Sequence, residues 1–105
     1  MKYAIPKASF NDVMQKSKSL LVGDLLFYYQ NTTISQIGFI VSRKMGGANL
    51  RNLFKRRCRT LFYANQTEGL SQYKIIIKPV KKLENHYSWE ELQVTFKKFL
   101  SKLLR

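Results

Sequence analysis

Apolar and polar positions recur with a helical period over the end of the chain. The apolar positions, mostly three or four residues apart, are Trp89, Leu92, Phe96, Phe99, Leu100 and Leu103. Ser88 and Glu91 match a capping box, in which each side chain bonds the other residue's backbone N–H. Upstream, a β-branched run stops at Pro79, which has no N–H to donate to a sheet. The pattern predicts a strand over 73–78 followed by a long C-terminal helix.

A second amphipathic helix is predicted from Leu50 to about Tyr63. The positions that form its apolar stripe are Leu50, Leu53, Phe54, Cys58, Leu61 and Phe62. The glycine-bearing segment 45–49 before it is typical of a loop. Asn49 is the expected N-cap, because its side-chain oxygen can accept a hydrogen bond from an N–H of the first turn.

The N-terminal half predicts a short helix and a hairpin. Ser9 followed by Asp12 resembles a weaker capping box, so a helix is expected to begin there. Its apolar face would carry Phe10, Val13 and Met14. The segments 24–30 and 34–42 are expected to be antiparallel strands joined by a turn at 31–33. Residues at 37–42 are apolar or small on both strand faces, so we expect both faces to be covered at least in part.

The order of helix, two or three strands, helix, strand and helix predicts an α+β fold. We expect a mixed sheet of about four strands with helices packed against it, in the order αβββαβα. A chain of 105 residues that is 45% hydrophobic fits one domain with one core. We therefore expect residues 1–105 to form a single domain.

The net charge narrows the choice of partner. Nineteen Lys and Arg against six acidic residues give a formal net charge of +13, which indicates a polyanion. The single cysteine, Cys58, suits a reducing cytoplasm. The segment 1–7 has a charge but no apolar stretch typical of a signal peptide, and the longest apolar stretch, 20–29, is interrupted by Gly23 and Asp24. Neither export nor a membrane span is therefore expected.

The cations are concentrated as well as numerous. No acidic residue lies between Asp24 and Glu68, whereas that interval holds Arg43, Lys44, Arg51, Lys55, Arg56, Arg57 and Arg59. In a helix, an arc of roughly 140° opposite the apolar stripe holds Arg51, Asn52, Lys55, Arg56 and Arg59. Arg57 falls within the apolar arc, so its stem should pack and its head should reach water. Because like charges on one face repel and guanidinium groups match phosphates, this face predicts RNA binding. A solvated or assembly-stabilising surface is the alternative.

One segment resembles a known family. The run from Val41 to Phe62 reads VSRKMGGANLRNLFKRRCRTLF. It is similar to the central motif of the bacterial ribonuclease P protein component, in which a basic pair and a glycine-containing turn precede an arginine-rich helix. The preceding segment 37–39 resembles the family's strand, and the likeness extends loosely over most of the chain. Three positions differ from the usual pattern: Leu53 replaces an arginine, Asn49 a β-branched residue and Met14 an aromatic residue.

The resemblance implies a ribosomal protein S5 domain 2-like fold with a left-handed βαβ crossover. It also implies a function: a protein subunit that binds the catalytic RNA of ribonuclease P and the 5′ leader of precursor tRNA. The subunit would assist Mg²⁺-dependent endonucleolytic removal of the leader, which is tRNA 5′ maturation. The RNA would hold the Mg²⁺ and carry out catalysis, so no catalytic residue or metal ligand is expected in the protein. Neither DNA nor a membrane is an expected partner.

Two groups of site residues follow from this resemblance. The RNA-binding residues would be Arg43, Lys44, Arg51, Asn52, Lys55, Arg56, Arg57 and Arg59. The leader would lie in a cleft between the first helix and the sheet, with a floor of Phe10, Met14, Leu26 and Tyr28. Aromatic stacking on bases tolerates any sequence, which suits a variable leader. Simple core packing is the alternative for Phe10 and Tyr28.

Two other functions are alternatives. A protein-only nuclease needs a general base or clustered carboxylates, whereas the only histidine, His86, lies in a polar linker and the acidic residues are scattered. A ribosomal or ribosome-assembly RNA-binding protein of the same α+β design is the stronger alternative, because composition does not separate it from a ribonuclease P subunit. The sequence also leaves the oligomeric state open.

Overall fold

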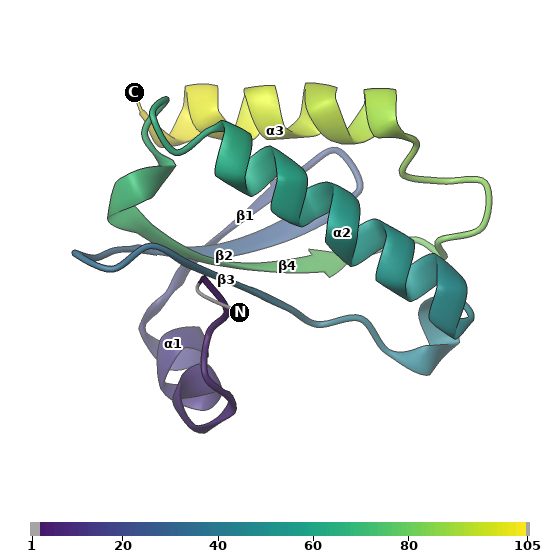
Figure 1. The fold of residues 1–105 in the computed structure, drawn as a ribbon, viewed down its shortest axis with the longest axis horizontal. Coiled ribbons are helices and arrows are strands. Elements are labelled where there is room, and N and C mark those ends of the chain that lie inside the picture. The colour runs from purple at the N-terminus through teal and green to yellow at the C-terminus, as the bar shows by residue number, and fades with distance from the viewer. Residues whose placement is uncertain (1–2, 105) are drawn as a thin grey trace.

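The computed structural model describes residues 3–104, in which one mixed four-stranded sheet carries three α-helices (Figure 1). The strands are β1 (Lys18–Val22), β2 (Leu25–Asn31), β3 (Gln36–Phe39) and β4 (Tyr73–Pro79), in the spatial order β1-β2-β4-β3. The helices are α1 (Phe10–Lys16), α2 (Ala48–Ala64) and α3 (Trp89–Leu103). Three single 3₁₀ turns accompany them: η1 (Lys7–Ser9), η2 (Arg43–Met45) and η3 (Leu70–Gln72). The predicted fold class and element order are confirmed.

The predicted hairpin was wrong, because its two segments do not pair. β2 pairs with β1, a strand missed in the sequence, across a connection at Gly23 and Asp24. Gly23 has φ +57°, a conformation that glycine adopts without steric cost and that tight hairpins require. β4 is inserted between β2 and β3, antiparallel to the former and parallel to the latter. The central place suits β4, because its three isoleucines at 75–77 are fully buried.

Helices cover both faces of the sheet. Figure 1 shows α2 and α3 on one side and α1 on the other. On the α2–α3 side, the rings of Phe27 and Phe99 stack with centroids 4.0 Å apart. On the α1 side, Ile5, Val13 and Ile76 form a smaller buried cluster. Ile37 and Phe39 of β3 pack in the larger core, and Phe10 and Ile5 lie against Gly38 between them, so the expected two-sided cover of this strand is confirmed.

The helix starts only partly follow the predicted caps. The Ser88 side chain accepts a hydrogen bond from the backbone N–H of Glu91 at 3.2 Å, which confirms the start of α3. Ser9 precedes α1 but makes no side-chain cap, because the η1 turn already holds its backbone in a helical conformation. α2 begins at Ala48 with Gly47 as N-cap, so Asn49 lies inside the first turn and its predicted capping role was wrong.

None of the helices within residues 3–104 combines the length and the apolar character that crossing a membrane requires.

Candidate nucleic-acid interface

α2 turns one face inward and the opposite face outward, as its sequence predicts. Four residues of the predicted apolar stripe are buried: Phe54, Cys58, Leu61 and Phe62. Leu50 is 37% exposed and Leu53 is half-buried, because the first turns of α2 extend beyond the sheet. Burial raises the pKa of the Cys58 thiol far above its usual range, an effect that the charge of Arg59 only partly offsets.

The outward face of α2 is a basic ridge, which we define as Arg51, Asn52, Lys55, Arg56 and Arg59. Asn52 and Arg56 are exposed, and the other three are half-buried. Within residues 3–104 the ion pairs are Lys16–Asp12 and Lys81–Asp24, so no ridge cation is neutralised by a carboxylate. Ridge side chains also make no hydrogen bond to the described part of the protein. Their donors are therefore available to an external anion.

Arg57 lies apart from the ridge, as its position in the apolar arc predicts. Its stem is half-buried, but its head does not simply enter water. Nη1 donates to the backbone carbonyl of Tyr87 at 3.5 Å. The side chain also lines a small hollow with Leu53 and His86, between α2 and the loop 81–87. The arginine that interrupts the stripe thus ties α2 to a neighbouring loop.

Two further cations stand immediately before α2. Arg43 and Lys44 lie in the η2 turn and are both exposed. The turn is held by a hydrogen bond from the N–H of Leu83 to the carbonyl of Met45, at 2.8 Å. These two cations therefore precede the N-terminus of α2 on an ordered turn.

A hollow of about 290 Å³ connects the basic ridge to the N-terminal segment. We call it the Phe10 hollow, and its lining residues are Ala4, Ile5, Lys7, Phe10, Ile37, Gly38, Phe39, Lys55 and Arg59. The guanidinium carbon of Arg59 lies 5.7 Å from the ring centroid of Phe39, a cation–π geometry. Phe10 approaches the β3 backbone closely, because a Cβ on Gly38 would lie 3.0 Å from Phe10 Cε2. Lys7 and Phe39 were not predicted as lining residues of this hollow, because no local sequence pattern indicates that they come together with Phe10.

The four residues expected to floor a cleft are brought only partly together. Phe10, Met14 and Tyr28 pack around the small cluster beneath α1, and each keeps part of its surface exposed. Leu26 lies two residues from Tyr28 on the same face of β2, but it does not join that cluster. It pairs with Leu21 of β1, which is 57% exposed. The sheet face is therefore covered near Phe10 and open near Leu26.

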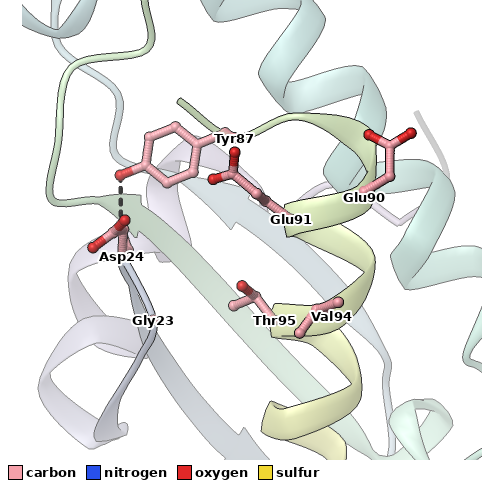
Figure 2. Close-up of a pocket in the computed structure, with 7 residues that line it drawn as sticks. All are labelled: Gly23, Asp24, Tyr87, Glu90, Glu91, Val94 and Thr95. Atoms are coloured by element: carbon pink, nitrogen blue, oxygen red, sulfur yellow. Dashed lines mark hydrogen bonds between the residues drawn. The ribbon is translucent and has the colours of Figure 1, made fainter. Parts of the chain in front are cut away.

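Three of the six acidic residues lie together at the start of α3. Figure 2 shows a hollow at the start of α3 lined by Gly23, Asp24, Tyr87, Glu90, Glu91, Val94 and Thr95. The Tyr87 hydroxyl donates to the carbonyl of Asp24 at 2.7 Å, and burial raises the pKa of this phenol. Glu90 and Glu91 stand in the first turn of α3, where the helix dipole favours negative charge. Three of the six carboxylates of the chain thus lie at one hollow, which repels a polyanion.

His86 belongs to the loop 81–87 and lines the small hollow beside Arg57. Its Nδ1 lies 2.9 Å from the carbonyls of both Lys82 and Glu84. Since carbonyls only accept, Nδ1 must carry the hydrogen. In the part of the chain that the structure describes, no three or more His, Cys, Asp or Glu side chains are grouped so as to hold a metal ion.

Comparison with known proteins identifies the family. The Ribonuclease P family model matches residues 5–104. The ribonuclease P protein component of Petrotoga mobilis is 31% identical, over 77% of this chain and 70% of that protein. The corresponding protein of Phytoplasma australiense is 30% identical, over 97% of this chain and 91% of its own length.

Solved structures agree with this assignment. A mutant RNase P protein of Staphylococcus aureus superposes with a TM-score of 0.80 and 26% identity, covering 96% of this chain and 87% of the other. The RNase P protein of Thermotoga maritima shares the fold with a TM-score of 0.81 and 23% identity, covering 94% of this chain and 96% of the other. With a family model that spans nearly all of its length, the chain belongs to the ribonuclease P protein component family.

Proposed function

We propose that this chain, as the protein subunit of ribonuclease P, holds two RNAs at once. The catalytic RNA lies along the basic ridge and the η2 turn, and the 5′ leader of precursor tRNA lies between α1 and the sheet. The observation that carries the proposal is that Lys55 and Arg59 belong to the ridge and also line the Phe10 hollow. An RNA strand that passes from the basic ridge into the cleft beneath α1 would stay in contact with these two cations.

The ridge supplies the affinity for the catalytic RNA. Together with the η2 turn it offers six cations that no carboxylate of residues 3–104 neutralises: Arg43, Lys44, Arg51, Lys55, Arg56 and Arg59. If each meets one phosphate, log K falls with log salt at a slope of about −5, and affinity falls about 10³-fold between 50 and 200 mM salt. Such contacts orient the protein on the RNA without reading its sequence.

The cleft supplies a surface that accepts any leader. Phe10 and Tyr28 offer partly exposed rings, and stacking of a base on an aromatic ring contributes about 1–3 kcal/mol regardless of the base. Phe10 packs closely against β3, because a Cβ added at Gly38 would lie 3.0 Å from Phe10 Cε2. The protein would thus hold the leader in a fixed direction next to the catalytic RNA, which favours cleavage by positioning.

In this proposal the chemistry stays with the RNA, whose phosphates hold the Mg²⁺ ions that the reaction requires. The protein neutralises phosphate repulsion and positions the substrate. We expect it to act in the cytoplasm, with precursor tRNA and the catalytic RNA as its partners.

The test is reconstitution with a ribonuclease P RNA at low Mg²⁺. Added protein is expected to restore cleavage of precursor tRNA, and Arg56→Ala should weaken this rescue. Lys98→Ala also removes an exposed cation, but from α3, and serves as the matched control. If the wild-type protein binds RNA but rescues no cleavage, the ribosomal or ribosome-assembly function replaces this one.

The leader site has a separate readout. Met14 stands beside Phe10 and Tyr28 where the family often has an aromatic residue, so Met14→Phe should increase the preference for precursor over mature tRNA. The affinity ratio of the two tRNAs measures this preference, because mature tRNA lacks the leader. An unchanged ratio would place the leader elsewhere.

A further inference from the structure

A second basic hollow opens at the β1–β2 side of the sheet. Its volume is about 460 Å³, which falls in the range of small-ligand sites. The lining residues are Lys16, Lys18, Tyr29, Gln30, Asn31, Tyr73, Lys102 and Leu103, and we call it the lysine–tyrosine hollow. They come from the ends of α1, β2 and α3 and from the starts of β1 and β4, and none comes from α2.

The charged side chains that line this hollow are all positive. Three exposed lysines line it, and no acidic residue does. Lys18 and Lys102 form no ion pair within residues 3–104. Lys16 is paired with Asp12 at 3.2 Å, but both side chains are more than 60% exposed, and such a pair is weak enough to be exchanged for another anion. The C-terminus of α3 contributes roughly half a negative charge, which three full positive charges outweigh.

The other lining groups are polar and unpartnered. In the described chain, the hydroxyls of Tyr29 and Tyr73 make no hydrogen bond, and neither do the side-chain amides of Gln30 and Asn31. The two rings are 6.4 Å apart at 60°, and both are half-exposed. Ammonium groups, amides and aromatic faces together match a nucleotide, because its phosphate needs cations while its base needs a ring and hydrogen-bond partners.

We propose that the lysine–tyrosine hollow is a second RNA-binding site, which takes a single-stranded segment. The phosphates lie against Lys16, Lys18 and Lys102, and one base stacks on Tyr73. This site goes beyond the function proposed above, because neither the basic ridge nor the cleft beneath α1 includes any of these residues.

A second site changes how the protein holds RNA. The basic ridge lies on α2 at the β3 side of the sheet, whereas the hollow opens at the β1 side. RNA bound at one site raises the effective concentration of a connected strand at the other. The strand has two possible sources: a distal part of the leader that passes the end of α1, or a single-stranded segment of the catalytic RNA.

The direct test is an NMR titration of the whole protein with oligouridylate. Amide resonances of Lys18, Asn31, Tyr73 and Lys102 are expected to shift together, separately from those of α2. The variant Lys18→Gln/Lys102→Gln should lose these shifts, and its salt slope of oligouridylate binding should fall by about 1.4, or 0.7 for each lost phosphate. The proposal is overturned if only α2 responds.

A charge-matched variant separates a site from general electrostatics. Lys97→Gln/Lys98→Gln also removes two exposed positive charges, but these lie on α3 outside the hollow. This variant should retain the oligouridylate-induced amide shifts at the lysine–tyrosine hollow and most of the salt slope of binding. Equal losses in the two double variants would overturn the proposal.

Photocrosslinking in the reconstituted holoenzyme identifies the source of the strand. 4-Thiouridine placed in the distal leader, or in single-stranded segments of the catalytic RNA, should crosslink to the peptide that contains Tyr73. A crosslink from one of the two RNAs names the ligand. Crosslinks from neither would overturn the site in the working enzyme.

Discussion

Alanine substitution of two neighbouring arginines of α2 should affect two different properties: RNA binding for Arg56 and stability for Arg57. Arg56 is exposed on the basic ridge with no side-chain partner among residues 3–104, so its loss should change stability by less than about 0.5 kcal/mol. The substitution should remove one phosphate contact and so lower the salt slope of RNA binding by about 0.9. Between 50 and 200 mM salt, the variant should therefore lose about 3.5-fold less affinity than the wild type does. Arg56→Ala is therefore a binding variant with a normal fold.

Arg57→Ala should instead be a stability variant. The change removes the one donor that the Tyr87 carbonyl has in the described structure, together with a half-buried stem. A hydrogen bond from a charged group contributes about 1.5–3 kcal/mol, but at 3.5 Å this one is at the long limit. We expect a loss of about 1 kcal/mol, which lowers Tm by about 4 °C in a domain of this size. The salt slope should stay the same.

Thermal unfolding followed by circular dichroism and a salt titration of binding to ribonuclease P RNA measure both quantities on each variant. Arg57→Lys is a useful control, because it keeps the charge but loses the forked donor. The reasoning fails if Arg57→Ala lowers the salt slope and leaves Tm unchanged. It fails equally if Arg56→Ala leaves the slope unchanged.

Three further predictions concern packing, ionisation and affinity. Gly38→Ala would place a Cβ 3.0 Å from Phe10 Cε2, so the free energy of unfolding, measured in urea, should fall by about 1–3 kcal/mol. An unchanged urea midpoint would contradict the close packing of Phe10 on β3. Burial raises the pKa of Cys58 above its ordinary value of 9.0, so above that pH the unfolded chain releases a proton that the folded chain keeps. The free energy of unfolding should then fall by up to about 1.4 kcal/mol per pH unit, and this part of the slope should vanish in Cys58→Ala when urea unfolding is compared between about pH 8 and pH 10. Leu53→Arg should restore the arginine usual at this position and make the salt slope of RNA binding steeper by about one, whereas an unchanged slope would show that position 53 does not reach a phosphate.

Elements whose pattern is strong within a short window were predictable. α3 has a complete apolar period and a capping box, and β4 has three adjacent isoleucines before a proline. β1 was missed because Lys18–Val22 shows no clean alternation. Strand pairing was wrong for a different reason: β2 and β3 are neighbours in sequence, but β4, whose three isoleucines at 75–77 are fully buried, lies between them.

The candidate site also has a part that the sequence predicted and a part that it did not. The basic ridge was predictable because its members share one helix, where spacing alone fixes a common face. The Phe10 hollow was not predictable as a whole, because Phe10, Phe39 and Arg59 meet only when β3 lies between α1 and α2. The partner of Arg57 is also nonlocal, since it lies thirty residues away along the chain.

The sequence by itself determined the class of fold, the cationic face of α2 and the expectation of an RNA partner, because helical period and net charge are properties of neighbouring residues. Only the tertiary structure decided the strand order, the sharing of Lys55 and Arg59 between the ridge and the Phe10 hollow, and the gathering of three lysines and two tyrosines at the far side of the sheet. These depend on contacts between distant segments, and burial of the core as a whole selects such contacts.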